Sequence, residues 1–196
     1  MVGKRLWVTG YRAYELNVFG SNDPKLKVLK TSLKNTLMQF LDEGLEWLIT
    51  GGQLGVEQWA VEVALGLKPL YPDFKIAMMV PFTDFGKQWN EDNQGQLAAL
   101  RGQVDFSDAV SQAPYQQPAQ LQGYTRFMTI HTDAALLVYD PEFPGKAKWD
   151  YQAAEAMADR RDYPVQLITM DDLEETAQAM AEAENEHFQN DWDMVS

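Results

Sequence analysis

The sequence predicts an α/β fold: an open, doubly wound, mainly parallel sheet with helices on both faces, as in Rossmann-like proteins. Short runs rich in β-branched and aromatic residues alternate along the chain with longer segments of helical periodicity. One run, FKIAMMVPF (74–82), is apolar on both faces, which is typical of a strand inside a parallel sheet. There are too few strand–helix units for a (β/α)8 barrel. No repeat, linker or low-complexity block divides the 196 residues, so we expect one domain.

Strands and helices alternate through the first half of the chain. The first helix is the clearest, because Asp23 suits the N-cap, Pro24 the first helical position and Gly44 the stop after the last turn. Its leucines recur at spacings of three and four, which indicates one buried face. We expect strands at 4–10, 45–50 and 74–82, and helices at 21–44, 54–67 and 88–103.

The second half continues the alternation and ends in an acidic segment that contains no Lys or Arg. We expect a domain of residues 1–182 followed by a solvated acidic C-terminal tail, residues 183–196. The alternative is that this tail docks onto a basic regulatory protein partner. The expected elements are a short edge strand at 104–111, strands at 133–140 and 163–170, and helices at 118–131, 148–162 and from Asp171 onward.

The composition restricts the classes of ligand and partner. The formal net charge is −13, which repels the nucleic-acid backbone, so we expect no nucleic-acid partner. A small anionic ligand stays compatible with this charge, because backbone N–H groups bind phosphate locally. There is no cysteine, His131 and His187 are the only histidines, and no acidic cluster has metal-ligand spacing, so no metal site is expected. No long apolar run indicates a signal peptide or membrane contact, and a cytoplasmic location is expected.

Candidate site residues lie at the carboxyl ends of the expected strands, where doubly wound proteins bind ligands. Glycines gather behind the first two strands, and bare backbone lets a ligand approach closely. The helix at 54–67 points free N–H groups into the same crevice, which suits an anion. The alternative is that TGGQLG (50–55) is only a tight turn, since it is neither GxGxxG nor a Walker-type motif. The residues placed at this crevice are Thr9, Gly10, Tyr11, Arg12, Gly51, Gly52, Gln53, Gly55, Glu57, Pro81, Phe82 and Tyr139.

Glu57 and the nearby aromatic and basic side chains each have two interpretations. A carboxylate in the first turn of a helix is stabilised by the helix dipole by about 0.3–1 kcal/mol, without any function. Beside the glycines, Glu57 also suits a ribose hydroxyl or a water to be activated. Trp89 and Trp149 are placed either to stack on a base or to pack in the core. Arg126 is placed either to reach a phosphate or to pair with a surface acid.

Several ordered motifs resemble the YpsA-like family of Gram-positive bacteria. They are VTGYRAYELNVF, FLDEGLEWLITGGQLGVEQWA, VPF, ALLVYDPE and YPVQLITMDDL, and they run from residue 4 to about residue 175. That family is placed in the SLOG superfamily, beside the LOG phosphoribohydrolases and the DNA-processing protein DprA. The resemblance implies a Rossmann-like fold that binds a nucleotide or nucleotide derivative, with a link to cell division or stress.

The ligand motif of that family, carried over by position, falls on the crevice already identified. The chain departs from the PGGxGTxxE motif of the LOG enzymes, because Thr50 replaces the proline and Leu-Gly-Val follows Gln53. The resemblance implies a ligand such as ADP-ribose, NAD or a nucleoside monophosphate, bound by a cytosolic sensor or regulator. It also implies the alternative of a LOG-type hydrolase of N-glycosidic bonds, in which Glu57 would be catalytic. The matching positions are Gly51, Gly52, Gln53, Gly55 and Glu57, with Gly10 and Tyr11 opposite.

A third hypothesis is a non-catalytic protein-interaction module in which the crevice has lost its ligand. Whether the protein is an enzyme stays open at this point. Under the binding hypothesis the glycines hold phosphate, Glu57 holds a ribose hydroxyl, and Tyr11, Phe82 or Trp89 covers the base. Paired surfaces are common in the superfamily, so the resemblance also implies a homodimer. No cofactor other than the nucleotide-like ligand is expected.

Overall fold

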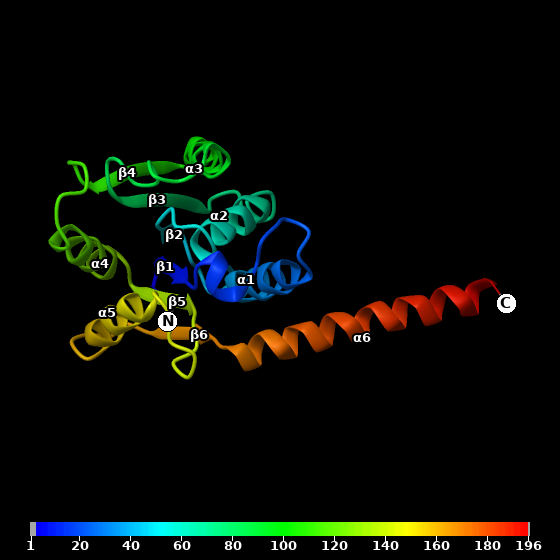
Figure 1. Ribbon diagram of the computed structural model, residues 1–196. Helices are drawn as coiled ribbons and strands as arrows, with labels where there is room; N and C mark the ends of the chain where they lie inside the picture. The colour runs from blue at the N-terminus through cyan, green and yellow to red at the C-terminus, as the bar shows by residue number, and fades with distance from the viewer. Residues whose placement is uncertain (1–2, 196) are drawn as a thin grey trace.

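The computed structural model of the protein describes the backbone of residues 3–195 and the side chains of residues 3–187. Within this range, six strands form one all-parallel sheet in the order β4-β3-β2-β1-β5-β6 (Figure 1). This confirms the predicted α/β fold with a parallel sheet. The strands are β1 (Arg5–Gly10), β2 (Trp47–Thr50), β3 (Lys75–Phe82), β4 (Phe106–Ser111), β5 (Ala134–Val138) and β6 (Val165–Ile168).

Helices cover both faces of the sheet, as predicted (Figure 1). One face carries α1, which contacts both α2 and α6, while α3 packs against α2. The other face carries α4 and α5, which contact each other. The helices are α1 (Pro24–Asp42), α2 (Val56–Leu67), α3 (Glu91–Gln103), α4 (Ala119–His131), α5 (Lys148–Ala158) and α6 (Met170–Val195). A short 3-10 helix, η1 (Ala13–Leu16), follows β1 and was not predicted.

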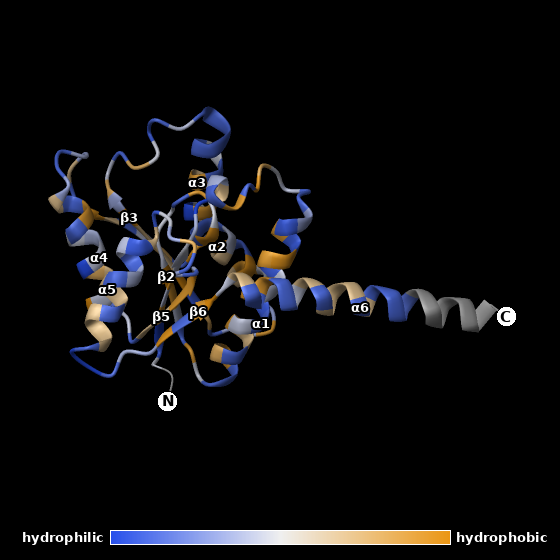
Figure 2. Cartoon of the chain, turned by 60° about the horizontal axis from the view of Figure 1, so that its bottom comes forward, coloured by the Kyte–Doolittle hydropathy of each residue, from blue (hydrophilic) through white to orange (hydrophobic). Residues whose placement is uncertain are grey.

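The local signals read from the sequence are present in the structure. The Asp23 carboxylate accepts a hydrogen bond from the Lys25 N–H at 2.9 Å, Pro24 is the first residue of α1, and Gly44 has a positive φ of 101° just after the helix. The central strands are buried on both faces, and Trp7 in β1 is fully buried. Figure 2 shows the hydrophobic residues gathered along the strands and on the helix faces that meet them. Burial of these apolar surfaces is the main force that holds the layers together.

The strand order has a reversal beside β1, and this reversal positions the site. The chain builds outward from β1 through β2 and β3 to the edge strand β4. Helix α4 then returns across the sheet, so that β5 pairs with the other side of β1. The loops that follow β1 and β5 therefore run in opposite directions. In doubly wound sheets, this separation leaves a crevice at the carboxyl ends of the two strands.

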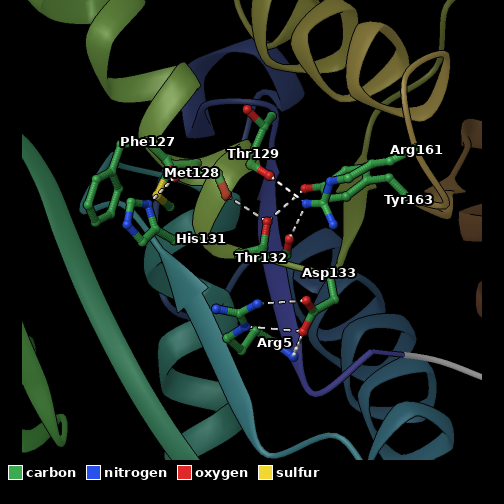
Figure 3. Close-up of polar contacts among 9 residues, drawn as sticks. All are labelled: Arg5, Phe127, Met128, Thr129, His131, Thr132, Asp133, Arg161 and Tyr163. Atoms are coloured by element: carbon green, nitrogen blue, oxygen red, sulfur yellow. Dashed lines mark hydrogen bonds and ion pairs between the residues drawn. The ribbon is translucent and has the colours of Figure 1, made fainter.

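A polar cluster closes the opposite end of the sheet, where β1 and β5 begin (Figure 3). The Arg5 guanidinium donates two hydrogen bonds to the Asp133 carboxylate, at 3.1 and 2.8 Å. The Arg161 guanidinium donates to the carbonyl oxygens of Thr129 and Thr132 at 2.9 and 2.6 Å, and so satisfies the last turn of α4. This cluster lies far from the crevice and has a structural role.

Helix α6 begins at Met170 and continues through the expected domain boundary at residue 182. Its first turns lie against α1, where Lys27 Nζ is 3.2 Å from the Glu184 carboxylate, and its far half points away from the rest of the chain (Figure 1). The role expected for residues 183–196 falls largely outside the described side chains and stays a prediction. No helix in the described part of the chain combines the length and apolar character of a membrane span.

Candidate functional site

A pocket of about 430 Å3 opens at the carboxyl ends of β1, β2 and β3, between α4 and the start of α5. We call its buried lining residues the floor: Thr9, Glu57 and Tyr124, together with the half-buried Asp150. We call its accessible cations, Arg12 and Lys146, the rim. The apolar wall consists of Phe85, Leu121 and Trp149. The pocket lies beside the strand-order reversal, where the fold predicts a ligand site.

The floor is built around one hydroxyl group that lies between two carboxyl groups. Thr9 Oγ1 is 3.2 Å from Glu57 Oε1 and 3.0 Å from Asp150 Oδ2. The Gln53 N–H donates to the other oxygen of Glu57 at 2.7 Å. Thr9 has one hydroxyl proton, so it donates to only one of the two carboxyl groups at a time.

The two carboxyl groups hold protons more tightly than exposed acids do. Burial raises the pKa of Glu57 above its ordinary value. Burial, and then the negative charge of Glu57, raise the pKa of Asp150 from 3.8 to about 7. The positive charge of Arg12 opposes both shifts. Near neutral pH the floor is therefore a mixture of forms with and without a proton on Asp150, which is a property of acid–base sites.

Tyr124 completes the floor from α4. Its side chain is 7% exposed, and its hydroxyl faces Glu57 without a hydrogen bond of good geometry to any described residue. Burial and the charge of Glu57 raise the pKa of Tyr124 well above 10, so the hydroxyl stays neutral and keeps its proton. A buried hydroxyl without a partner is uncommon and costs stability unless a ligand or water satisfies it.

The glycines behind β2 are required by the protein's own close contacts. A Cβ on Gly51 would collide with the Tyr124 hydroxyl and lie 2.7 Å from a Glu57 carboxylate oxygen. A Cβ on Gly55, which has a φ of 116°, would lie 2.6 Å from the Tyr11 carbonyl oxygen. A Cβ on Gly52 would lie 2.7 Å from the tip of the Leu97 side chain, which is a contact that the leucine can relieve by moving. The main chain that approaches this turn most closely is thus the segment after β1.

These glycines lie behind the pocket, since Gly51, Gly52 and Gly55 are absent from its lining. Amide groups of the same turn are already hydrogen bonded within the chain. The Gln53 N–H donates to Glu57, and the Leu54 N–H donates to the Gln53 side-chain oxygen at 3.0 Å. The Val56 N–H donates to the Tyr11 carbonyl at 3.1 Å. Phosphate binding by the backbone of this turn stays a prediction. The close contact between this turn and the segment after β1 is explained by the alternative that TGGQLG is a folding turn.

The structure brings about half of the predicted side chains into the pocket. The predicted residues that line it are Thr9, Gly10, Arg12, Gln53, Glu57 and Pro81. Tyr11 and Tyr139 instead lie on the other side of β1, with ring centroids 5.4 Å apart. The Tyr11 hydroxyl accepts from the Asp140 N–H at 3.0 Å and donates to the Phe143 carbonyl at 2.7 Å. Tyr11 therefore anchors the loop at 139–147, which carries Lys146 to the rim.

Three other predicted residues lie outside the pocket lining. Phe82 and Trp89 pack around Phe85, with ring centroids 5.8 and 5.1 Å from it, and so support the apolar wall from behind. Arg126 lies on a separate groove between α4 and α5 that Arg160 also lines. Direct ligand contact by these side chains stays a prediction.

Two floor residues were not predicted from the sequence. Asp150 lies in the first turn of α5, after a loop whose path the sequence pattern does not reveal. Tyr124 lies in the middle of α4, the helix that crosses back over the sheet. A carboxylate at the start of the helix that follows β5 was the available signal for Asp150, because β5 is the neighbour of β1. Trp149, which was considered for stacking on a base, does line the pocket and is 61% exposed.

Metal binding is not supported by the described side chains. No group of three or more His, Asp or Glu side chains in residues 3–187 is arranged as metal ligands. The floor has two carboxyl groups only, whereas Ca2+ takes six to eight oxygen ligands. The chemistry that the floor can perform is therefore hydrogen bonding, charge stabilisation and proton transfer.

Comparisons with known proteins extend over nearly all of the chain. A family model described as the YspA SLOG family (YpsA) matches residues 6–173. A UPF0398 protein of Latilactobacillus sakei is 55% identical over 185 residues, which is 94% of this chain and 100% of the relative. A UPF0398 protein of Levilactobacillus brevis is 56% identical over 181 residues, or 92% of this chain and 96% of the relative. One of Leuconostoc citreum is 54% identical over 187 residues, or 94% and 99%.

Proposed function

The chain belongs to the YpsA family of SLOG proteins, and on this premise we propose that it binds a nucleotide or nucleotide derivative, of the ADP-ribose or NAD kind, as a cytosolic sensor or regulator. The proposed site is the pocket at the carboxyl ends of β1–β3. A role in cell division or stress is part of the same proposal and follows from the resemblance alone.

The polarity of the pocket is the observation that carries this proposal. Two carboxyl groups lie at the floor, while Arg12 and Lys146 lie at the rim of a protein whose net charge is −13. Neither rim cation forms an ion pair with a described carboxylate within 4.0 Å. The rim therefore suits an anionic group such as phosphate, and the floor suits hydroxyl donors.

The apolar wall adds a third matching feature. Trp149 presents a largely exposed indole ring beside the rim, with Lys148 Nζ over one face at 4.6 Å from the ring centroid, and Leu121, which is 45% exposed, lines the same pocket. An aromatic face of this kind stacks on any nucleobase, with little dependence on base identity. A volume of about 430 Å3 is also within the range of small-molecule sites. The rim is thus complementary to phosphate, the floor to the sugar hydroxyls, and the apolar wall to the base.

A thermal-shift screen tests the proposal. The probes are ADP-ribose, NAD, AMP, ATP and cyclic dinucleotides. A ligand at 100 times its dissociation constant stabilises the folded state by about 2.7 kcal/mol. For a chain of this length that corresponds to a rise of roughly 5–10 °C in Tm. Lys146→Ala should reduce the shift, whereas Lys34→Ala, an equal charge change on the exposed surface of α1, should not. No shift with any probe would favour the interaction-module hypothesis.

The floor also favours a second candidate function, cleavage of an N-glycosidic bond. Two carboxyl groups within hydrogen-bond reach of one hydroxyl, one of them with a pKa of about 7, provide an acid and an anion side by side. Ionised Glu57 would stabilise the positive charge that develops on the ribose, and protonated Asp150 would donate its proton to the leaving base. Water would then add to the sugar carbon as the N-glycosidic bond breaks, and its released proton would return to the Asp150 carboxylate.

Chromatography of a ligand found in the screen distinguishes the two functions. An enzyme would release free base and ribose product with time, and Asp150→Asn would slow release while binding persists. Unchanged ligand after long incubation with stoichiometric protein would leave binding as the function.

A further inference from the structure

The floor has fewer hydrogen-bond donors than its two carboxyl groups can accept. Glu57 accepts from the Gln53 N–H and shares the Thr9 hydroxyl with Asp150. Within the described residues, the Thr9 contact is the one hydrogen bond that the Asp150 carboxyl group makes. When Thr9 donates to Glu57, the Asp150 carboxyl group, which lines the pocket, has no donor among the described residues. A hydroxyl group of a bound molecule can take the place of water as that donor.

The Tyr124 hydroxyl is a further polar group at this floor. Its side chain is more than nine-tenths buried, and the hydroxyl lies beside the Glu57 carboxylate in a geometry too poor for a full hydrogen bond, so it can turn to a ligand oxygen instead. Gly51 leaves the space that this hydroxyl needs. Polar groups from β1, α2, α4 and α5 thus converge on the floor of the pocket.

The floor fits a ligand that supplies two uncharged hydrogen-bond donors. A metal ion would find only two carboxyl groups, and a cationic ligand would be repelled at the rim by Arg12 and Lys146. An uncharged diol on an anionic molecule needs no metal ligands and is not repelled by the rim cations. Two hydroxyl groups on adjacent carbon atoms place two donors close together, and the acceptors on Glu57 and Asp150 both lie within 3.2 Å of Thr9 Oγ1.

We propose that the Glu57–Thr9–Asp150 floor, with Tyr124, recognises the vicinal 2′,3′-diol of a ribose and rejects 2′-deoxyribose. This inference rests on the proposed nucleotide-binding function and specifies its substrate class. Asp150 and Tyr124 are specificity-determining residues in this account. The physical reason is the cost of a buried acceptor left unpaired, which lets a site built for a hydroxyl reject the analogue that lacks it strongly.

Titration calorimetry with matched pairs of probes tests the inference. The first pair is AMP and 2′-deoxy-AMP, and the second is ribose 5-phosphate and 2-deoxyribose 5-phosphate. We expect the deoxy compound of each pair to bind about 100-fold more weakly or worse. Asp150→Asn and Tyr124→Phe, which keep the shape of the side chain, should each reduce this ratio about tenfold. Trp149→Ala should weaken both members of the nucleotide pair and leave their ratio unchanged.

Each outcome bears on one proposal or on both. Equal binding of AMP and 2′-deoxy-AMP by the unaltered protein would overturn the diol inference and leave the proposed function in place. Discrimination between the two sugar phosphates without nucleotide binding would support the diol inference and overturn the nucleotide function. Absence of binding by all of the probes would overturn both. A ratio unchanged in Asp150→Asn and in Tyr124→Phe, with normal unfolding curves, would overturn the roles of these residues.

Discussion

Asp150→Asn should make the protein more stable, and the gain should be clearly larger at pH 8 than at pH 5. Asn has the shape of a protonated Asp and keeps a partner for the Thr9 hydroxyl, but it carries no charge. In the folded protein the pKa of Asp150 is raised from 3.8 to about 7 by burial and by the charge of Glu57. At pH 8 the unaltered protein therefore holds a second buried negative charge, which the variant lacks.

The sign of this pH dependence follows from the difference in proton binding between the folded and the unfolded chain. The folded chain keeps the Asp150 proton up to about pH 7, whereas the unfolded chain releases it near pH 4, so the folded state binds more protons between these values. The free energy of unfolding consequently falls as the pH rises from about 4 to 7 and then levels off. At 1.36 kcal/mol per pKa unit, this shift corresponds to an upper limit of about 4 kcal/mol. Because Asp150 lines a pocket that water enters, we expect about half of that, roughly 2 kcal/mol.

Thermal unfolding of both proteins at pH 5 and pH 8 provides the measurement. A gain of roughly 2 kcal/mol at pH 8 corresponds to a rise of about 4–8 °C in Tm for a chain of this length. Asp159→Asn is the matched control, because Asp159 is an exposed acid at the end of the same helix. Its effect should be equal at the two pH values. If Asp150→Asn shifts Tm equally at pH 5 and pH 8, the reasoning about the buried acid pair is refuted.

Three further substitutions test the framework around the pocket by denaturant unfolding. Gly55→Ala should lower the free energy of unfolding by several kcal/mol, because Gly55 has a positive φ and its new Cβ would lie 2.6 Å from main-chain atoms. Gly66→Ala is the control, because this glycine lies in open space on α2, and it should be neutral or stabilising by up to about 1 kcal/mol. Tyr11→Phe should cost about 1–3 kcal/mol and increase proteolysis in the loop at 139–147, whereas an unchanged cleavage pattern would show that the hydroxyl does not anchor this loop. Arg161→Ala should cost about 1–3 kcal/mol through the unpaired carbonyls at the end of α4, and the exposed Arg160→Ala should cost less than 0.5 kcal/mol; equal losses would argue against the capping role.

Most of the fold could be predicted from the sequence, because its local signals agree with one another. The helix at 21–44 has a cap, a proline and a stop in the right order, and the structure begins and ends α1 accordingly. The strand at 74–82 is apolar on both faces, and β3 lies inside the sheet. The 3-10 helix after β1 was missed, because its four residues are too few to show a period.

The site was predictable only where a strand leads directly into it. Thr9 lies at the end of β1 and Glu57 follows β2 closely, so the strand-end rule finds them. Asp150 follows a long loop whose path depends on contacts from elsewhere in the chain, including the Glu15 carboxylate, which accepts from the Lys146 N–H at 2.7 Å. Tyr124 depends on how α4 crosses the sheet. Such long-range packing has no periodic signal in the sequence, so these two residues required the structure.

The strand order also decides when, during synthesis, a working pocket can first exist. Thr9 and Glu57 are made early, but Tyr124 and Asp150 reach them only after α4 has crossed and β5 has been inserted beside β1. A chain that stops at the end of β4 contains four of the six described strands and lacks two of the four floor residues, Tyr124 and Asp150. Contacts between segments this distant in sequence form slowly. A ligand at this junction would stabilise only those chains that have completed the crossover, and it would protect them from proteases that remove unfinished molecules.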